Sequence, residues 1–270
     1  MQHVWFTEPE AIRTTAKRRN FERVMSKLSS YGEYASGEYL EYQKKYAAQI
    51  RESDRVIIEM VRDIVKRRGE GRPLSLVDIG CSSGNLLYHL KRQVPGLELH
   101  GGDAFPGIIE ACRQNPELEG ISFDQMDLLD LDGRPRFDIV IVNAVLFLFP
   151  EPDFDRAIVN IASVTKGGGH FITFDLFHPA EQELSIIEKS ETHPGGLNLH
   201  FRPFSIVRVT LAKHGLSNVF FKPFLIGIDL PKPKRTADIS SHTVRTKSGE
   251  RLIFRGTLFT PWCHVLAEKA

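Results

Sequence analysis

The sequence predicts an α/β fold with a doubly wound, mostly parallel sheet. From residue 74 onward, short apolar runs alternate with helical stretches, the pattern of βαβ units with helices on both faces of one sheet. The first apolar run ends in a turn of small residues, "GCSSG", that leads directly into a helical stretch. A chain of 270 residues is long enough for one such domain plus an appendage.

The appendage is expected at the N-terminus, because residues 1–72 are charged and patterned for helix. Its clearest piece is residues 50–69, where apolar side chains recur at helical spacing and Gly69 suits a C-terminal stop. The sequence therefore predicts a helical lid over residues 1–72 and a main domain over residues 73–270.

The elements of the main domain follow in order. Strands are expected at residues 74–80, 97–103, 121–126, 137–143, 169–177, 218–228 and 258–268, and helices at residues 85–93, 105–114, 154–164 and 205–214. Between the last two strands lies a polar stretch with the hairpin signal "KSGE" in place of a clear crossover helix. A final antiparallel strand is therefore expected.

Composition favours an ordinary globular protein. A formal net charge of +1 gives no whole-chain sign of a nucleic-acid or membrane binder, so membrane binding is not expected and nucleic acid is disfavoured. The N-terminal residues lack the apolar core of a signal peptide, and no apolar run approaches the roughly 18 residues of a membrane span. Three scattered cysteines predict neither a disulfide framework nor a metal site. A cytoplasmic location is the expectation.

The most informative segment is "LSLVDIGCSSGNLLYHL". It places Asp78 at the end of a strand, Gly80, Ser82 and Gly84 in a tight turn, and a helix N-terminus just beyond. Such a turn lets backbone approach a ligand closely, at the sheet edge where nucleotides bind in open α/β folds. The glycine spacing disfavours a nicotinamide dinucleotide site, and the absence of Gly-Lys-Ser/Thr excludes a P-loop.

This segment resembles motif I of the class I S-adenosylmethionine-dependent methyltransferases, D/E-x-G-x-G-x-G, with Ser82 in place of the middle glycine. The resemblance covers about residues 74–228 and the final strand. It implies a seven-stranded sheet of order 3-2-1-4-5-7-6 with strand 7 antiparallel. It also implies S-adenosylmethionine as cofactor and S-adenosylhomocysteine as product.

The resemblance also implies roles for residues at later strand ends. Asp103 would bind the ribose hydroxyls and Phe105 would lie beside the adenine. Asp127 and Leu128 would lie near the adenine amino group, and Asn143 would line the methionine side. The cofactor-binding set expected is Asp78, Gly80, Ser82, Gly84, Asp103, Phe105, Asp127, Leu128, Asn143 and Tyr39.

Tyr39 belongs to an unusual segment, residues 31–46, which holds five of the six tyrosines. Tyr39, Tyr42 and Tyr46 share one helical face. Ring faces attract cations, so a tyrosine-rich lid could cover the sulfonium of the methyl donor. The alternative is that these tyrosines only pack a helix onto the domain.

The candidate general base is His178 in "FDLFHP", just past the fifth strand; His193 and His200 are weaker candidates. A histidine beside a proline is more often a solvated or packing residue, and this alternative stays open. The extra stretches 179–203 and 229–256 are expected to shape substrate choice. The second is rich in basic residues, which could recognise a phosphate, an acidic substrate or RNA. The favoured alternative is that these residues belong to a solvated hairpin.

The leading function is methyl transfer to a small-molecule acceptor. The alternatives are an RNA or protein methyltransferase and a non-catalytic S-adenosylmethionine-binding protein. "NAVLFLFP" after the fourth strand lacks the Asn-Pro-Pro-aromatic signature of enzymes that methylate adenine or glutamine amino groups. The acceptor and the oligomeric state do not follow from the sequence.

Overall fold

The computed structural model describes residues 49–69, 71–191, 193–237 and 239–270. The tyrosine-rich segment and the Tyr39 prediction therefore lie outside the described residues. None of the helices within these ranges is long and apolar enough to span a membrane.

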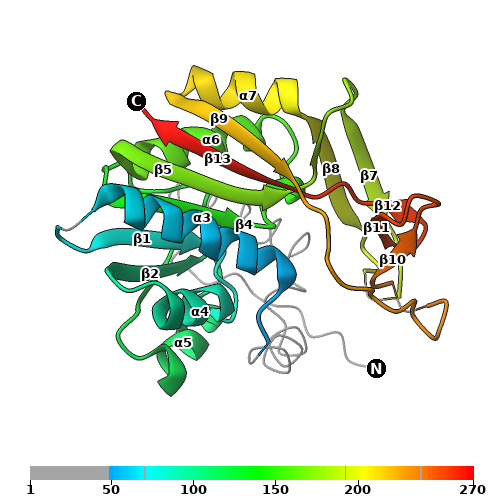
Figure 1. Cartoon of the computed structure of the whole chain (residues 1–270), viewed down its shortest axis with the longest axis horizontal. Coiled ribbons are helices and arrows are strands. Elements are labelled where there is room, and N and C mark those ends of the chain that lie inside the picture. Colours follow the sequence, from blue (N-terminus) through cyan, green and yellow to red (C-terminus); the bar gives the residue numbers. More distant parts are fainter. Residues whose placement is uncertain (1–48, 70, 192, 238) are drawn as a thin grey trace, which may run out of the picture.

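The centre of the molecule is a seven-stranded sheet (Figure 1). Its spatial order is β3-β2-β1-β4-β5-β13-β9, in which β13 pairs antiparallel with both β5 and β9 and the other pairings are parallel. This confirms the expected order and the antiparallel final strand. The strands are β1 Leu74–Ile79, β2 Leu97–Asp103, β3 Ser122–Gln125, β4 Phe137–Asn143, β5 Thr165–Asp175, β9 Leu216–Pro223 and β13 Cys263–Lys269.

Helices cover both faces of this sheet (Figure 1). On one face α3 (Glu52–Arg68), α4 (Asn85–Gln93) and α5 (Pro106–Arg113) share one apolar cluster with β1 and β4. On the other face α6 (Asp153–Val164) and α7 (Phe204–Lys213) share a second cluster with the opposite sides of the strands. Short 3₁₀ turns lie at η2 (Pro116–Leu118) and η3 (Leu146–Leu148). All five expected helices are present, and α3 is packed into the core of the domain.

The two extra stretches form small sheets of their own. Strands β6 (Phe177–His178), β7 (Leu184–Glu188) and β8 (Leu197–Pro203) form one, and β10 (Ser241–Arg245), β11 (Arg251–Arg255) and β12 (Leu258–Phe259) form the other. The "KSGE" hairpin joins β10 to β11, as expected, whereas the β7–β8 hairpin was not predicted. Both small sheets lie together beyond the carboxyl end of β5 (Figure 1).

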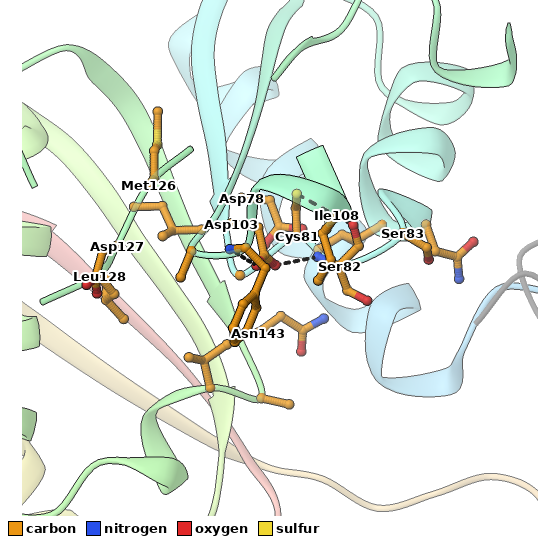
Figure 2. A pocket seen from close by; sticks show the side chains of 18 of the residues that line it. Asp78, Cys81, Ser82, Ser83, Asp103, Ile108, Met126, Asp127, Leu128 and Asn143 are labelled. Atoms are coloured by element: carbon orange, nitrogen blue, oxygen red, sulfur yellow. Dashed lines mark hydrogen bonds between the residues drawn. The ribbon is translucent and has the colours of Figure 1, made fainter. Parts of the chain in front are cut away.

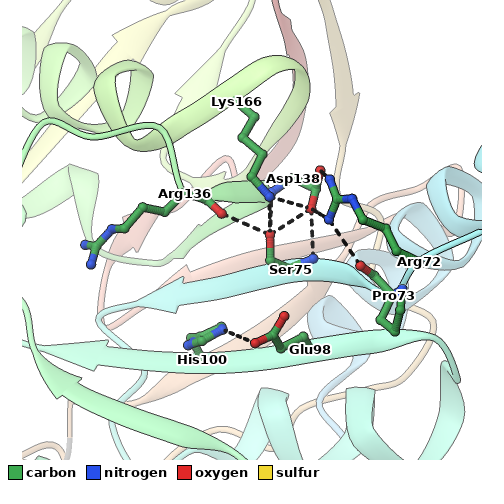
Figure 3. Close-up of polar contacts among 8 residues, drawn as sticks. All are labelled: Arg72, Pro73, Ser75, Glu98, His100, Arg136, Asp138 and Lys166. Carbon is green, nitrogen blue, oxygen red and sulfur yellow. Dashed lines mark hydrogen bonds and ion pairs between the residues drawn. The ribbon is translucent and has the colours of Figure 1, made fainter.

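The amino ends of the strands carry a polar cluster (Figure 3). The Asp138 carboxylate accepts hydrogen bonds from Arg72 Nη2 at 2.8 Å, from Ser75 Oγ at 2.7 Å and from Lys166 Nζ at 3.0 Å. These residues come from the segment before β1 and from the first residues of β1, β4 and β5. The cluster fixes the starts of three neighbouring strands at the edge opposite to the cavity described next.

Candidate functional site

A cavity of about 520 Å³ lies at the carboxyl ends of β1, β2 and β4. Eight of the ten predicted cofactor-binding residues line it, including Asp78, Asp103, Asp127 and Asn143 (Figure 2). The other four are Gly80, Ser82, Phe105 and Leu128. Gly84 is not among the lining residues but lies between two that are, Ser83 and Asn85. Asp78 and Asn143, which are 65 positions apart in sequence, meet here because parallel strands end at one edge of the sheet.

The turn after β1 requires unusual backbone. Gly80 and Gly84 have φ values of 84° and 73°, and a Cβ on Gly80 would lie 2.6 Å from a methyl group of Val145. Ser82, at the position where the motif has a glycine, also has a positive φ of 50°. The serine therefore adopts the left-handed conformation that glycine adopts without strain.

Asp103 is fixed by the backbone at the end of β2. Its Oδ2 accepts a hydrogen bond from the Ser82 amide and its Oδ1 accepts one from the Phe105 amide, both at 3.1 Å. Burial raises the pKa of this carboxyl, and the amide hydrogen bonds oppose that shift. The two amides hold the carboxylate in one orientation on the wall of the cavity, as a residue that binds a pair of hydroxyls requires.

Asp78 is a deeply buried acid of the site, 2 % exposed. Burial, together with the nearby charges of Asp54 and Asp103, raises its pKa to about 8. Its Oδ1 has no hydrogen-bond partner among the described residues. A cationic or hydrogen-bond-donating group in the cavity would satisfy this oxygen.

Asp54 is a cavity residue that sequence reasoning missed. It lies in the first turn of α3, is 1 % exposed, and its Oδ1 accepts a hydrogen bond from Asn143 Nδ2 at 3.0 Å. Burial raises its pKa. A signal was present in the sequence, because Asp54 has the i, i+3, i+4, i+7 spacing of the buried face with Ile57, Ile58 and Val61. An acid on an apolar helix face is expensive to bury and therefore marks a site.

The polar atoms around the glycine turn fit an S-adenosylmethionine-type ligand. Besides Asp78 Oδ1, the buried atoms Ser82 Oγ, Ser83 Oγ and Asn85 Oδ1 have no hydrogen-bond partner within the described part of the chain. Ser83 and Asn85 flank Gly84, the N-cap of α4, where the helix also presents free backbone amides. Such a set of donors and acceptors matches the carboxylate and ammonium groups of an amino acid. The apolar side chains of Met126 and Leu128, which follow β3, and of Ile108 in α5 also line the cavity (Figure 2), which suits a flat base.

His178 does not lie in this cavity. It is in β6, 6 % exposed, and lines a second cavity of about 460 Å³ between the two small sheets. Burial lowers its pKa, so the imidazole is neutral at neutral pH. The weaker candidates have structural roles: His200 Nδ1 lies 2.8 Å from Ser185 Oγ across the β7–β8 pair, and His193 closes a turn with Ser190.

Several basic residues of the second extra stretch are engaged in ion pairs. Arg245 and Arg251 both bind the Asp229 carboxylate, the latter at 2.8 Å, and Arg235 lies 3.4 Å from Glu191. These pairs favour the solvated hairpin over a surface that recognises phosphate.

Comparison with known proteins relates the segment around this cavity to methyltransferases. Residues 76–169 match the family described as a methyltransferase domain. Trans-aconitate 2-methyltransferase of Methylobacterium nodulans is 33 % identical over 88 residues, which cover 33 % of this chain and 33 % of that protein. A tRNA N(3)-methylcytidine methyltransferase of Schizosaccharomyces pombe is 31 % identical over 112 residues, which cover 38 % of this chain and 44 % of that protein. The matched segment thus spans less than half the length of these relatives.

The fold also matches solved structures over almost the whole chain. The 1,6-didemethyltoxoflavin-N1-methyltransferase of Burkholderia thailandensis, solved with its acceptor and S-adenosylhomocysteine, aligns with a TM-score of 0.53 at 13 % identity. The alignment covers 98 % of this chain and 92 % of that one. At this identity the likeness establishes the fold.

Proposed function

We propose, on the premise that this chain carries a class I S-adenosylmethionine-dependent methyltransferase domain, that it transfers a methyl group from S-adenosylmethionine to a small-molecule acceptor. The observation that carries the proposal is the convergence of Asp78, Asp103, Asp127 and Asn143 on one cavity. They lie at the ends of, or just after, four adjacent strands of one sheet. The family model that matches residues 76–169 is a methyltransferase domain, and the named relatives are methyltransferases.

The residues of the cavity suit separate parts of the cofactor. Asp103, held by the amides of Ser82 and Phe105, would accept hydrogen bonds from the two ribose hydroxyls. Asp127, whose Oδ1 also accepts from the Leu129 amide at 3.0 Å, would receive the adenine amino group. Asp78 and the glycine turn would hold the amino-acid part, where a protonated amine would stabilise the ionised form of Asp78.

The bound cofactor would supply a methyl carbon that is already activated by its positive sulfur, so the protein has mainly to align the acceptor and exclude water. Asn143 and Asp54 form the wall at the end of β4, on the side where the methionine part is expected, and their mutual hydrogen bond fixes both side chains. A hydroxyl acceptor must also lose a proton, for which Asp54 and His178 are the candidate acceptor groups.

A small-molecule acceptor is favoured over RNA by the charges on the described surface. The relatives include enzymes of both kinds, named for trans-aconitate and for tRNA. The net charge of this chain is +1, and the arginines of the second extra stretch named above pair with acids. Phosphate-backbone binding depends on unpaired basic side chains.

The test is calorimetric titration with S-adenosylmethionine and S-adenosylhomocysteine. Asp103→Ala is expected to weaken binding by about 1–3 kcal/mol, because the ribose hydroxyls lose a charged partner. Asp124→Ala is the matched control, since this acid lies on β3 next to the site but its side chain is 64 % exposed and pairs loosely with Arg113 at 3.8 Å. The control is expected to bind like the wild type.

Failure of the folded wild type to bind either ligand would refute the proposal. Binding with the expected loss in Asp103→Ala, but without methylated product across acceptors of several classes, would support a non-catalytic binding protein instead.

A further inference from the structure

The second cavity, of about 460 Å³, is formed by the two extra stretches that the core fold does not need. Phe177, Leu184 and Phe201 line it from the sheet of β6, β7 and β8, and Ile253, Leu258 and Phe259 line it from the sheet of β10, β11 and β12. Its volume is within the range of small-molecule sites. Most of the lining comes from the two small sheets and the loops beside them, with Pro223 of β9 and Phe204 of α7 contributed by the core fold, so the cavity depends on elements that the bare fold lacks.

The lining of this cavity is almost entirely apolar. No aspartate or glutamate of the described residues lines it, in contrast to the four acids of the first cavity. Two of its polar residues are already engaged: Arg251 Nε donates to Asp229 at 2.8 Å, and Thr260 Oγ1 donates to the Ile253 carbonyl at 3.1 Å. An anionic ligand would therefore have to compete with Asp229 for Arg251, the one arginine among the described residues of the lining.

His178 supplies one polar atom that is not engaged. Its side chain is more than nine-tenths buried, it lines this cavity, and its Nε2 has no hydrogen-bond partner among the described residues. An unpartnered buried ring nitrogen carries a desolvation cost that a ligand hydroxyl or amine would remove. The buried imidazole thus offers a hydrogen-bonding position within a largely apolar enclosure, to which Gln182 adds an amide on the exposed side.

The rim of the cavity is apolar as well. Leu184, Leu225 and Phe259 line it and are 40 %, 74 % and 43 % exposed. Large apolar side chains that gather at the mouth of a cavity indicate a ligand or partner that covers them. By contrast, none of the large apolar side chains exposed in the described ranges lines the first cavity.

Side chains of one packed apolar cluster line both cavities. It includes Leu148, which lines the first cavity, and Phe201 and Trp262, which line the second. Within it the Phe147 and Trp262 rings meet edge to face at 5.8 Å between centroids. Leu148 of the η3 turn lines the first cavity, and the neighbouring Phe147 packs against Trp262, which lines the second, so the η3 turn lies beside both linings.

We propose that the second cavity binds the apolar body of the methyl acceptor, an uncharged molecule built on one or two rings, with a single hydroxyl or amine held by His178. This proposal rests on the proposed function, because it assigns the acceptor side of that reaction. It disfavours a tricarboxylate such as trans-aconitate and an RNA strand, since both would bring several negative charges to a lining whose one described arginine is already paired with Asp229.

The experiment uses N-phenyl-1-naphthylamine, an uncharged secondary amine that joins a phenyl ring to a naphthalene and fluoresces strongly only in apolar surroundings. In a Trp5→Phe background Trp262 is the one tryptophan of the chain, so energy transfer from Trp262 to the probe reports binding beside it. The blocking variants are Ala180→Phe and Gln182→Phe, because both side chains line the cavity and both residues are exposed, so the added ring does not disturb the core. Val209→Phe, 67 % exposed on α7 and outside both cavities, is the matched control.

We expect saturable one-to-one binding with energy transfer in the background protein, affinity at least about tenfold weaker in each blocking variant, and no change in the control. S-adenosylhomocysteine should not displace the probe, and the blocking variants should bind S-adenosylhomocysteine normally. Absence of energy transfer, unchanged affinity in both blocking variants, or displacement by S-adenosylhomocysteine would overturn the inference. Normal probe binding in a protein that binds no S-adenosylhomocysteine would refute the proposed function and its acceptor assignment, while supporting the cavity as an apolar binding site.

Discussion

At the residue scale, the protonation of Asp78 is the property that depends most on the fold. A carboxyl in water has a pKa near 4, whereas burial beside Asp54 and Asp103 raises the pKa of Asp78 to about 8, with Arg51 opposing the shift. Between these two pH values the folded protein holds a proton that the unfolded chain has lost. The stability that Asp78 contributes is therefore complete below about pH 4 and is lost as the pH rises towards 8.

The first prediction is that Asp78→Asn makes the stability of the ligand-free protein less dependent on pH. The amide does not titrate, so the free energy of unfolding of the variant relative to wild type should increase from pH 5 to pH 8, by at most about 1.4 kcal/mol per pH unit. Urea unfolding at pH 5, 6.5 and 8 measures this difference. Asp54 and Asp103 titrate in both proteins, so part of the slope remains; parallel curves for the two proteins would contradict the assignment.

The same shift predicts the proton balance of ligand binding. If the amino group of the ligand stabilises ionised Asp78, binding at pH 7 releases a proton, because the free site is mostly protonated there. Calorimetry in buffers of different ionisation enthalpy measures that proton. Asp78→Asn should abolish the release, and an equal release from wild type and variant would exclude Asp78 as its source.

At the scale of elements, a buried arginine from the first extra stretch stabilises the loop after β4, residues 144–149, which includes η3. Arg202 in β8 is fully buried, its Nη1 donates to the Leu146 carbonyl at 3.3 Å, and its Nη2 donates to the Phe149 carbonyl. Its guanidinium also lies 4.0 Å from the centre of the Phe154 ring. From the other side, Asp175 Oδ2 accepts from the Leu146 amide at 2.8 Å. The loop that lines the first cavity is thus held by both the core sheet and the extra sheet.

Arg202→Met is predicted to destabilise the protein by about 3–5 kcal/mol. The substitution removes the cation near the buried Asp175 carboxyl, and it leaves the Leu146 and Phe149 carbonyls without their donor. It should also weaken S-adenosylhomocysteine binding, since Leu148 and Phe149 of this loop line the first cavity. Urea unfolding and calorimetry measure the two effects.

Arg208→Met is the matched control for this substitution. Arg208 lies on the exposed face of α7, with its guanidinium over the Phe221 ring at 5.1 Å and a hydrogen bond to the Val219 carbonyl at 3.1 Å. A loss of no more than about 1 kcal/mol is expected there. Similar losses in both variants would show that Arg202 contributes no more than a surface arginine.

At the scale of the whole molecule, the two edges of the sheet respond to pH in opposite directions. At the amino edge, burial alone would raise the pKa of Asp138, but hydrogen bonds from Arg72, Ser75 and Lys166 outweigh it and hold the pKa well below its ordinary value. The contribution of Asp138 to stability is therefore present above about pH 4 and is lost as the pH falls below it. At the carboxyl edge, burial raises the pKa values of Asp54, Asp78 and Asp103, so the contribution of these acids to stability falls as the pH rises. This division separates the edge that stabilises the fold from the edge that is left to bind a ligand.

Asp138→Asn is predicted to destabilise the protein by about 1–3 kcal/mol at pH 7, with a difference from wild type that shrinks as the pH falls towards 2. Affinity for S-adenosylhomocysteine should not change, because the substitution lies at the edge opposite to the cavity. Acid titration of the unfolding free energy and calorimetry at pH 7 measure both. A loss of ligand affinity in a folded variant would show that the two edges are coupled.

The local pattern of this sequence determines the core fold and the positions of its strand ends. Helices α4, α5, α6 and α7 follow from apolar periodicity to within a residue or two, because each buries one face against the sheet. Asp103 and Asn143 could be placed at the cavity from sequence because each is the last residue of a parallel strand, and parallel strands end together.

The tertiary structure alone decides what lies beyond those strand ends. His178 follows β5 by three residues, yet the chain enters the small sheet with β8 at that point, and this pairing takes the imidazole to the second cavity. Asp54 reaches the first cavity because α3 packs beside the end of β4, where its partner Asn143 lies 89 residues away in sequence. Arg202 reaches the loop beside that cavity, where its partner Leu146 lies 56 residues away in sequence. Local sequence encodes the period of an element, but it does not encode which distant element will provide the partner for a buried charge.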